Sequence, residues 1–193
     1  MRHASELAAL LRSAVASRPA RRLERSGHDR AAILVPVLDT PEGAALLLTV
    51  RAPHLSRHAG QIAFPGGRLE PGEDDLAAAL RETLEEVGLV VDPGDVHGRL
   101  DDHPSPFGLI ATPLVASVPW PAPLVVHAAE VTETFVVPLA RLRALTPSVD
   151  VRDSPWGRRV MHCYEVDGRR VWGLTGSVVK DLLDRLALVE VPT

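Results

Sequence analysis

The sequence contains one cysteine, no long apolar run and no excess of positive charge. A single cysteine, Cys163, in 193 residues excludes an intramolecular disulfide and a cysteine-rich metal site, which is typical of a reducing compartment. No stretch of about eighteen apolar residues is present, and residues 1–18 are charged with helical periodicity, unlike a signal peptide. We therefore expect a cytoplasmic protein with no membrane partner.

The formal net charge of -4 supplies no general attraction for nucleic acid or anionic lipid. We expect no nucleic-acid partner, so a phosphate-bearing ligand is a small molecule held by a local site. The composition, 46% hydrophobic and 24% charged, is close to the globular average. The length fits one domain with appendages, and no internal repeat or low-complexity tract is present.

The chain is predicted to divide into an N-terminal helix with a basic connector, residues 1–30, and a main domain, residues 31–193. In the main domain, β-rich runs at 31–39 and 44–52 predict a hairpin, and a second hairpin turns at Asp167 and Gly168. Residues 175–188 predict a C-terminal helix capped by Thr175 or Ser177. Strands that flank at least two helices without strict βαβ alternation favour an α/β fold with a mixed β-sheet over a doubly wound parallel sheet.

Residues 64–89, FPGGRLEPGEDDLAAALRETLEEVGL, place three glutamates on one predicted helix. The helix is expected to begin near Asp74 or Asp75, where a carboxylate caps backbone N–H groups, and to end at Gly88. Projected at about 100° per residue, one arc is apolar and holds Leu76, Leu80, Thr83, Leu84 and Val87. The opposite arc holds Glu82, Glu85 and Glu86. We expect the apolar arc to pack on the sheet and the acids to point outward together.

The spacing of these glutamates makes them repel one another. Glu82 lies three residues from Glu85 and four from Glu86, which brings such side chains to about 5 to 6 Å. At an effective dielectric of about 20, two charges about 5 Å apart repel by roughly 3 kcal/mol, so a partly covered face requires a cation. Carboxylates suit Mg²⁺ or Mn²⁺, whereas zinc is disfavoured because no histidine or cysteine is suitably spaced.

The alternative is a solvated helix face on which Arg81 is a surface partner of the acids. The turn that precedes the helix favours the cation site instead. Glycines at 66, 67 and 72 let the backbone approach a neighbouring group closely. A glycine-rich turn directed at an acidic helix face is therefore interpreted as a metal site.

Residues 67–89 resemble the Nudix box, in which Gly, five residues, Glu and seven residues precede Arg-Glu-hydrophobic-any-Glu-Glu-any-Gly-hydrophobic. The invariant positions are matched by Gly67, Glu73, Arg81, Glu82, Glu85, Glu86 and Gly88. Thr83 departs from the pattern, which prefers an aliphatic residue, although its methyl group can still pack. The resemblance implies a Nudix-type α/β/α sandwich and hydrolysis of a nucleoside diphosphate linked to another moiety.

The resemblance also implies roles for the residues of the box. Glu82 and Glu86 would be the main metal ligands, completed by Glu85 and the carbonyl of Gly67. Arg81 would orient a glutamate through charge-assisted hydrogen bonds, while Glu73 ties the loop to the helix. Gly66 and Gly88 would be structural residues of the motif.

The family does not use one general base, so two alternatives stay open. The base is Glu82 or Glu85, acting through a water molecule, or else a loop glutamate, Glu130 or Glu133. Either loop glutamate is otherwise an ordinary surface acid. A carboxylate near the activated water can accept its proton in both cases.

Residues 47–67, LLTVRAPHLSRHAGQIAFPGG, resemble the segment that precedes the box in the coenzyme A pyrophosphatase subgroup. The matching residues are Leu47, Leu48, Thr49, Arg51, Ala52, Gly60, Phe64, Pro65, Gly66 and Gly67. The pattern places a second arginine at Ser56, whereas the arginine here is Arg57. Residues 100–116 and 171–176 also resemble the subgroup. The resemblance implies cleavage of coenzyme A, or of its thioesters or oxidised form, to 3′,5′-ADP and 4′-phosphopantetheine.

Four residues before the box are candidate substrate ligands. Arg51, Arg57 and His58 would bind the 3′-phosphate or the diphosphate, and Gln61 would make a polar contact. The alternative is that they make only structural hydrogen bonds. Two rival functions also stay open: a Nudix pyrophosphatase acting on ADP-ribose, NADH or a nucleoside triphosphate, and a non-catalytic module that senses a nucleotide.

Overall fold

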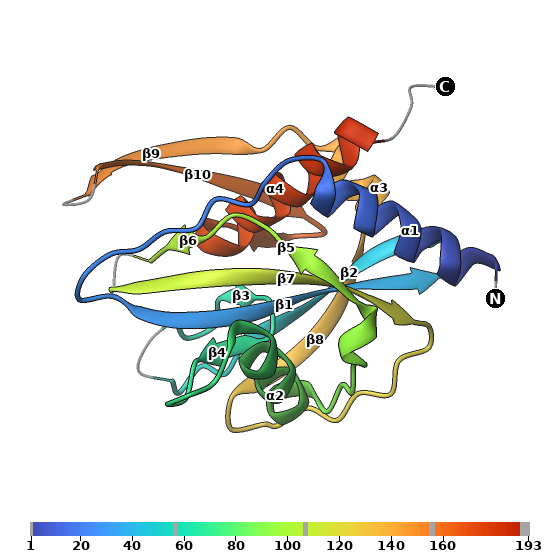
Figure 1. The fold of residues 1–193 in the computed structure, drawn as a ribbon, viewed down its shortest axis with the longest axis horizontal. Coiled ribbons are helices and arrows are strands. Elements are labelled where there is room, and N and C mark those ends of the chain that lie inside the picture. Colours follow the sequence, from blue (N-terminus) through green and yellow to red (C-terminus); the bar gives the residue numbers. More distant parts are fainter. Residues whose placement is uncertain (1, 56–57, 106–107, 155–156, 190–193) are drawn as a thin grey trace.

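A computed structural model describes residues 2–55, 58–105, 108–154 and 157–189 of the chain (Figure 1). Among these residues the helices and strands follow in the order α1 Arg2–Ala16, β1 Asp29–Thr40, β2 Gly43–Arg51, β3 Ile62–Ala63, β4 Gly66–Arg68, α2 Asp75–Val87, a 3₁₀ turn Pro93–Asp95, β5 Val96–Arg99, β6 His103–Pro104, β7 Leu109–Pro119, β8 Val131–Pro138, α3 Leu139–Ala144, β9 Ser148–Ser154, β10 Gly157–Val166, β11 Arg169–Val171 and α4 Gly173–Val189. No helix in the described ranges is long and apolar enough to cross a membrane.

A mixed β-sheet forms the centre of the molecule. Its strand order is β3-β2-β1-β7-β5, with β4 also paired to β1, β6 to β7 and β8 to β2. β1 and β7 run parallel from Asp29 opposite Leu109 to Asp39 opposite Pro119, whereas β1 and β2 form the predicted antiparallel hairpin. The expected mixture of parallel and antiparallel pairing is therefore confirmed.

The side chains of β1 alternate between two apolar layers. Ala32 and Leu34 pack with Ala78 and Ala79 of α2. Ile33 and Val35 belong instead to a larger cluster on the other face, to which α1 and α4 contribute. This is the period of two that a strand buried on both faces imposes. Helix α2 thus covers one face of the sheet and α1 and α4 cover the other (Figure 1), which confirms the α/β/α sandwich.

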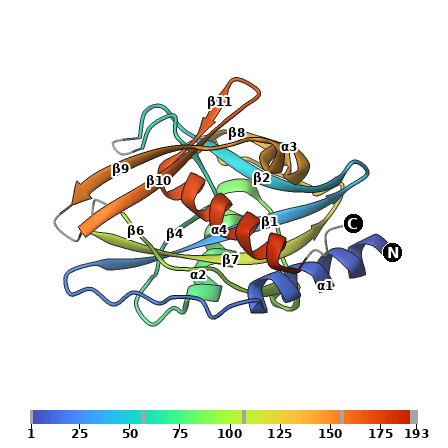
Figure 2. The same ribbon diagram turned by 90° about the horizontal axis from the view of Figure 1, so that it is seen from above.

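The C-terminal third adds a second, smaller sheet in the order β11-β10-β9, beside α4 (Figure 2). The β10–β11 hairpin turns at Asp167 and Gly168, whose φ angles of 50° and 74° are the positive values that the sequence predicts there. The predicted cap of α4 is wrong. The helix begins at Gly173, so Thr175 and Ser177 lie inside it and bond to the carbonyls of Ile62 and Gly173.

Helix α1 contributes to the core of the sheet rather than lying apart from it. Its residues Leu7, Leu11 and Ala14 belong to the same buried cluster as Val178 and Leu182 of α4. A division of the chain at residues 30 and 31 stays a proposal about folding units, because the two parts share this core.

Two adjacent aspartates fasten the connector between α1 and β1. Asp102 is fully buried and accepts hydrogen bonds from Arg30, Thr112 and the backbone N–H of Leu23. Asp101 faces the α4 side, where it accepts bonds from two further arginines, Arg18 and Arg185. Because buried carboxylates need such partners, this part of the segment that resembles the coenzyme A subgroup has a structural role.

Candidate active site

Helix α2 has the boundaries that the sequence predicts. Asp74 caps the N-terminus by accepting the backbone N–H of Ala77 at 2.8 Å. Gly88 ends the helix with a φ of 67°, and its N–H bonds to the carbonyl of Leu84 at 2.9 Å. The left-handed conformation favours glycine. These two caps fix the register of the three glutamates between them.

The prediction that all three glutamates point outward is wrong. The Glu86 side chain is only 3% exposed, whereas that of Glu82 is 17% and that of Glu85 54% exposed. Leu84, predicted to be buried, is 51% exposed. The end of α2 is covered by the segment around residues 125–131, where the N–H of His127 bonds to the carbonyl of Glu86 at 2.9 Å. That long-range contact moves the buried face away from the apolar arc.

The glycine-rich turn packs directly against the glutamates. The N–H of Gly66 donates to the Glu86 carboxylate at 3.0 Å. A Cβ atom at Gly67 would lie 2.2 Å from the carboxylate carbon of Glu82, so no other residue fits there without movement. A Cβ at Gly66 would lie 2.3 Å from the carbonyl oxygen of Ala32, and its φ of 145° also favours glycine. The close approach expected of these glycines is therefore present.

Arg81 forms hydrogen bonds with three glutamates of the acidic face. Its guanidinium bonds to both oxygens of Glu73 at 2.9 and 3.0 Å. One nitrogen also bonds to Glu82 at 3.0 Å and to Glu85 at 3.1 Å. Glu73 accepts the backbone N–H of Glu70 as well, and these bonds hold its pKa below the usual value. Arg81 thus ties the loop before the helix to two of the three helix glutamates.

The buried glutamates are poorly compensated. Burial raises the pKa of Glu86 to about 7, against the opposing influence of the Gly66 N–H and of Arg51, whose nearest nitrogen is 3.5 Å away. Burial also raises the pKa of Glu82, although its bond to Arg81 works in the other direction. A raised pKa means that the charged form is destabilised. The site therefore holds negative charge that further positive charge would stabilise.

The two loop glutamates have different surroundings. Glu130 is close enough to the acidic face that its charge raises the pKa values of both Glu82 and Glu86. Its carboxylate lies 3.5 Å from His127, and its backbone carbonyl accepts the N–H of Ala52 at the end of β2. Glu133 instead forms a two-bond pair with Arg169 of β11, at 2.7 and 3.1 Å. Only Glu130 faces the helix glutamates.

The model of the NUDIX domain family matches residues 27–152, well over half of the chain. The chain belongs to the Nudix family. It is 37% identical over 163 residues to a protein of Yersinia pestis named uncharacterized Nudix hydrolase NudL, covering 82% of this chain and 80% of that protein.

Two solved Nudix structures have the same fold. A MutT/nudix family protein from Enterococcus faecalis superposes with a TM-score of 0.59 at 15% identity, over 89% of this chain and 66% of that one. RenU, a Nudix hydrolase from M. smegmatis, superposes with a TM-score of 0.56 at 21% identity, over 86% of this chain and 90% of that one. The family and the fold together identify the chain as a Nudix hydrolase of the pyrophosphatase kind.

Nudix hydrolases use divalent metal ions, and the donor set here fits one. In the described part of the chain no three acidic, histidine or cysteine side chains converge as a metal cluster, and Glu82 and Glu85 are bonded to Arg81. The donors are nevertheless hard carboxylate oxygens, which suit such ions. Among the described residues, the buried Glu86 carboxylate is compensated by the N–H of Gly66 and by one arginine nitrogen 3.5 Å away, and a bound cation would stabilise its charged form further.

The candidate substrate residues lie in the strand and loop before the Nudix box. Arg51, at the end of β2, reaches Glu86, and its Nε is buried without a partner among the described residues. His58 bonds to the side chain of Gln61 at 2.8 Å. Gln61 lines a pocket of about 300 Å³ near the β3 edge. Arg57 lies outside the described residues.

The same small pocket contains residues that the sequence did not single out as ligands. Trp172 and Arg170 line it together with Arg169, and Arg170 stacks 5.6 Å from the Trp172 ring. Trp172 lies in the segment 171–176, which resembles the coenzyme A subgroup. That resemblance is the feature of the sequence that could have identified Trp172 as a candidate ligand. Only the fold brings this segment beside Gln61, more than a hundred residues earlier in the chain.

Proposed function

We propose that this Nudix hydrolase cleaves the diphosphate bond of coenzyme A, or of its derivatives, into 3′,5′-ADP and 4′-phosphopantetheine. The observation that carries the proposal is the seating of Glu82 and Glu86 against Gly67 and Gly66, directly beside Arg51. An acidic face and the arginine that we propose as a phosphate ligand therefore lie next to each other. We propose coenzyme A as the substrate because residues 47–67 resemble the coenzyme A pyrophosphatase subgroup.

Glu82, Glu86, Glu85 and the carbonyl of Gly67 would hold Mg²⁺ or Mn²⁺. When bound, such an ion neutralises charge on a diphosphate and makes hydroxide available near neutral pH. Arg81 keeps Glu82 and Glu85 in place through its anchor on Glu73. Its role is that of a positioning residue, because its guanidinium is already filled by glutamates and the carbonyl of Arg68.

Arg51 is proposed to bind a phosphate group of the substrate. Among the described residues, its Nε has no partner and its contact to Glu86 is long, at 3.5 Å, which leaves guanidinium donors for a ligand. For the general base, the surroundings favour Glu130 over Glu133, since Arg169 occupies both oxygens of Glu133. Glu82 and Glu85 stay alternatives for this role. Arg57, His58 and Gln61 stay proposed substrate ligands.

The test is a substrate panel with identified products. Coenzyme A, ADP-ribose, NADH and ATP are compared at equal concentration with Mg²⁺ and with Mn²⁺, and Glu86→Gln serves as the control for contaminating hydrolases. We expect the highest kcat/KM for coenzyme A, with 3′,5′-ADP as a product. Equal or faster turnover of ADP-ribose would reject the substrate, and failure to hydrolyse any compound would support a nucleotide-sensing module.

Arg57 gives a sharper test of the coenzyme A assignment. If it binds the 3′-phosphate, Arg57→Ala raises KM more for coenzyme A than for the dephospho form, which lacks that group. The same comparison for Arg51→Ala separates a 3′-phosphate ligand from a diphosphate ligand, since a diphosphate ligand affects both substrates alike. An identical effect of Arg57→Ala on the two substrates removes Arg57 from the 3′-phosphate.

A further inference from the structure

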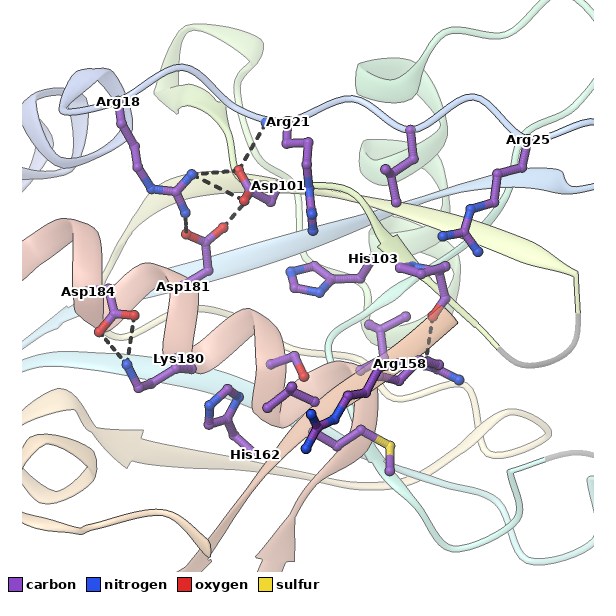
Figure 3. Close-up of a pocket in the computed structure, with 17 residues that line it drawn as sticks. Arg18, Arg21, Arg25, Asp101, His103, Arg158, His162, Lys180, Asp181 and Asp184 are labelled. Atoms are coloured by element: carbon purple, nitrogen blue, oxygen red, sulfur yellow. Dashed lines mark hydrogen bonds and ion pairs between the residues drawn. The ribbon is translucent and has the colours of Figure 1, made fainter. Parts of the chain in front are cut away.

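A pocket of about 400 Å³ lies on the α4 side of the molecule. Its walls come from the connector between α1 and β1, from β6, from β10 and from α4 (Figure 3). No residue of the Nudix box lines it. Because α4 and α2 pack on opposite faces of the central sheet, this pocket is separate from the proposed catalytic site. Its volume is within the range of small-molecule sites, which is about 300 to 1,000 Å³.

The pocket carries more positive than negative charge. Three aspartates line it, against six cationic side chains: Arg18, Arg21, Arg25, Arg158, Arg159 and Lys180. Two of the six are paired with these acids, Arg18 with Asp101 and Asp181 and Lys180 with Asp184. The remaining four have no carboxylate partner in the described ranges. This local excess contrasts with the chain's formal net charge of -4.

The unpaired cations converge from two sides. Arg21 and Arg25 extend from the connector, and Arg158 comes from β10 opposite them (Figure 3). Within the described part of the chain, these three side chains make no hydrogen bond or ion pair. Arg159 donates only to the carbonyl of Pro104, and burial together with the charge of Arg25 lowers its pKa. Like charges gathered without counterions are unfavourable, so the arrangement favours binding of an anion.

Two histidines add hydrogen-bonding groups that are not used. The Nε2 atom of His103 and the Nδ1 atom of His162 are buried, and neither has a partner among the described residues. Burial lowers the pKa of both rings, so both are neutral at pH 7. Leaving a buried polar atom unsatisfied costs about 1–3 kcal/mol, which a ligand that bonds to it would remove. His103 lies between the connector arginines and β10 (Figure 3).

Part of the charge in this region is structural. Arg185 is fully buried and bonds to Asp181 and Asp101, as well as to two carbonyls of α1 and the connector. Together with Arg18 this network holds α1 onto α4 and leaves no charge unsatisfied. Arg21 joins this network through its backbone N–H alone, and the side chains of Arg21, Arg25 and Arg158 and the two buried histidine nitrogens make no bond to it. Arg21 and Arg158 are exposed to solvent and Arg25 is partly buried.

We propose that this pocket is a second ligand site, which binds the phosphate or diphosphate group of a small phosphorylated molecule. Guanidinium groups match phosphate oxygens in geometry and charge. The ring nitrogens of His103 and His162 supply further hydrogen bonds. A small ligand is favoured over a nucleic acid, because the excess positive charge is confined to one pocket of a chain whose net charge is negative.

Calorimetry on the metal-free full-length protein tests the proposal. Pyrophosphate and inorganic phosphate are titrated into the unchanged chain, into Glu86→Gln, and into an Arg25→Ala/Arg158→Ala double variant. The matched control is Arg22→Ala/Arg152→Ala, which removes one arginine from the connector and one from β9, the strand that pairs with β10. These control arginines pair with Asp75 and Asp150 and do not line the pocket. Circular dichroism checks that every variant is folded.

We expect saturable uptake of pyrophosphate at one site, equal in the unchanged chain, in Glu86→Gln and in the control pair. In the pocket double variant binding weakens at least tenfold. No saturable binding by the folded chain overturns the proposal. If the control variant weakens pyrophosphate binding as much as the pocket variant does, the effect comes from overall charge and the proposal is overturned. If Glu86→Gln abolishes binding, pyrophosphate binds at the Nudix site and not in this pocket. Tighter binding of a single-stranded oligonucleotide through the same two arginines also overturns the assignment to a small ligand.

A second measurement does not depend on arginine variants. The histidine ring signals of the folded protein are followed by NMR during the pyrophosphate titration and assigned with His103→Gln and His162→Gln. We expect the signals of His103 and His162 to move with the binding curve while that of His54, which bonds to the carbonyl of Ala129, stays fixed. Unmoved signals for both pocket histidines while binding occurs would contradict the site.

Discussion

The two faces of the central sheet hold buried charge in different ways. On the α4 face, fully buried Arg185 is matched by Asp101 and Asp181, and each of its nitrogens has an acceptor. On the α2 face, the partners of buried Glu86 among the described residues are one backbone N–H donor and a single arginine nitrogen 3.5 Å away. Compensated charge of the first kind holds elements together. Uncompensated charge of the second kind destabilises the protein until a ligand supplies the opposite sign.

The largest expected effect comes from removing the uncompensated charge. Glu86→Gln should lower kcat/KM by about a thousandfold, because a catalytic metal contributes several kcal/mol of transition-state stabilisation. Turnover is measured over a range of Mg²⁺ and Mn²⁺ concentrations, with metal uptake followed by calorimetry. A variant that keeps its activity and its metal affinity would remove Glu86 from the metal site.

Removing the compensated charge should act on stability instead. Among the described residues, Arg185→Met leaves Arg18 as the one cationic side chain bonded to Asp101 and Asp181, beside the backbone N–H groups of Arg21 and Asp101. We therefore expect the free energy of unfolding to fall by about 3 kcal/mol. Urea denaturation measures this, and Arg152→Met, which removes an exposed pair, should change stability by less than about 1 kcal/mol. A loss as small as that of the control would show that the network is not needed for the fold.

The pH dependence of the stability of the metal-free protein should reveal the cost of burying the charge of Glu86. Its pKa is about 7 in the folded protein against the ordinary 4.5, so the folded state keeps a proton that the unfolded chain has lost. The contribution of Glu86 to the free energy of unfolding therefore falls by about 1–3 kcal/mol as the pH rises from about 4.5 to 7. Denaturation across this range, with Glu86→Gln as the control, measures the slope. Because Glu86 is buried, we expect the metal-free Glu86→Gln variant to be more stable than the unchanged chain at pH 7.

A substitution at Arg81 tests whether activity depends on the shape of the guanidinium group as well as on its charge. Arg81→Lys keeps the positive charge but loses the planar fork that bonds to Glu73, Glu82 and Glu85 together. We expect a 10- to 100-fold lower kcat/KM, since residues that hold metal ligands have effects of about this size. Raising the metal concentration should restore part of the rate, which a loss of folding would not allow. An unchanged metal dependence would contradict a positioning role.

The smallest effect is expected at Leu84, the exposed apolar residue of α2. Leu84→Gln should change the free energy of unfolding by no more than about 0.5 kcal/mol, because this side chain is half exposed. Thermal denaturation is compared with that of Val87→Ala, which removes fully buried methyl groups of the same helix. If the two substitutions destabilise the protein equally, Leu84 packs against a partner in solution.

The sequence predicted the N-terminal cap of α2 at Asp74 or Asp75, its C-terminal cap at Gly88 and the turn at Asp167 and Gly168, because these features depend on neighbouring residues alone. It also predicted the mixed sheet from the order of its elements. It did not predict β9, whose sequence SVDVRDS has few core residues and gains its order by pairing with β10. The cap of α4 was misplaced for a related reason, since Thr175 is used by Ile62, a residue distant in the chain.

The sequence by itself determined the family, the spacing of Glu82, Glu85 and Glu86 on one helix and the need for glycine beside them, because helical periodicity and backbone freedom are local properties. Only the tertiary structure decided that Glu86 is buried while Leu84 is exposed, that Glu130 rather than Glu133 faces the acids, and that arginines from the connector and from β10 share one pocket. Each of these depends on segments that meet across the fold, and the free energy of burying a charge is set by all the neighbours it meets there.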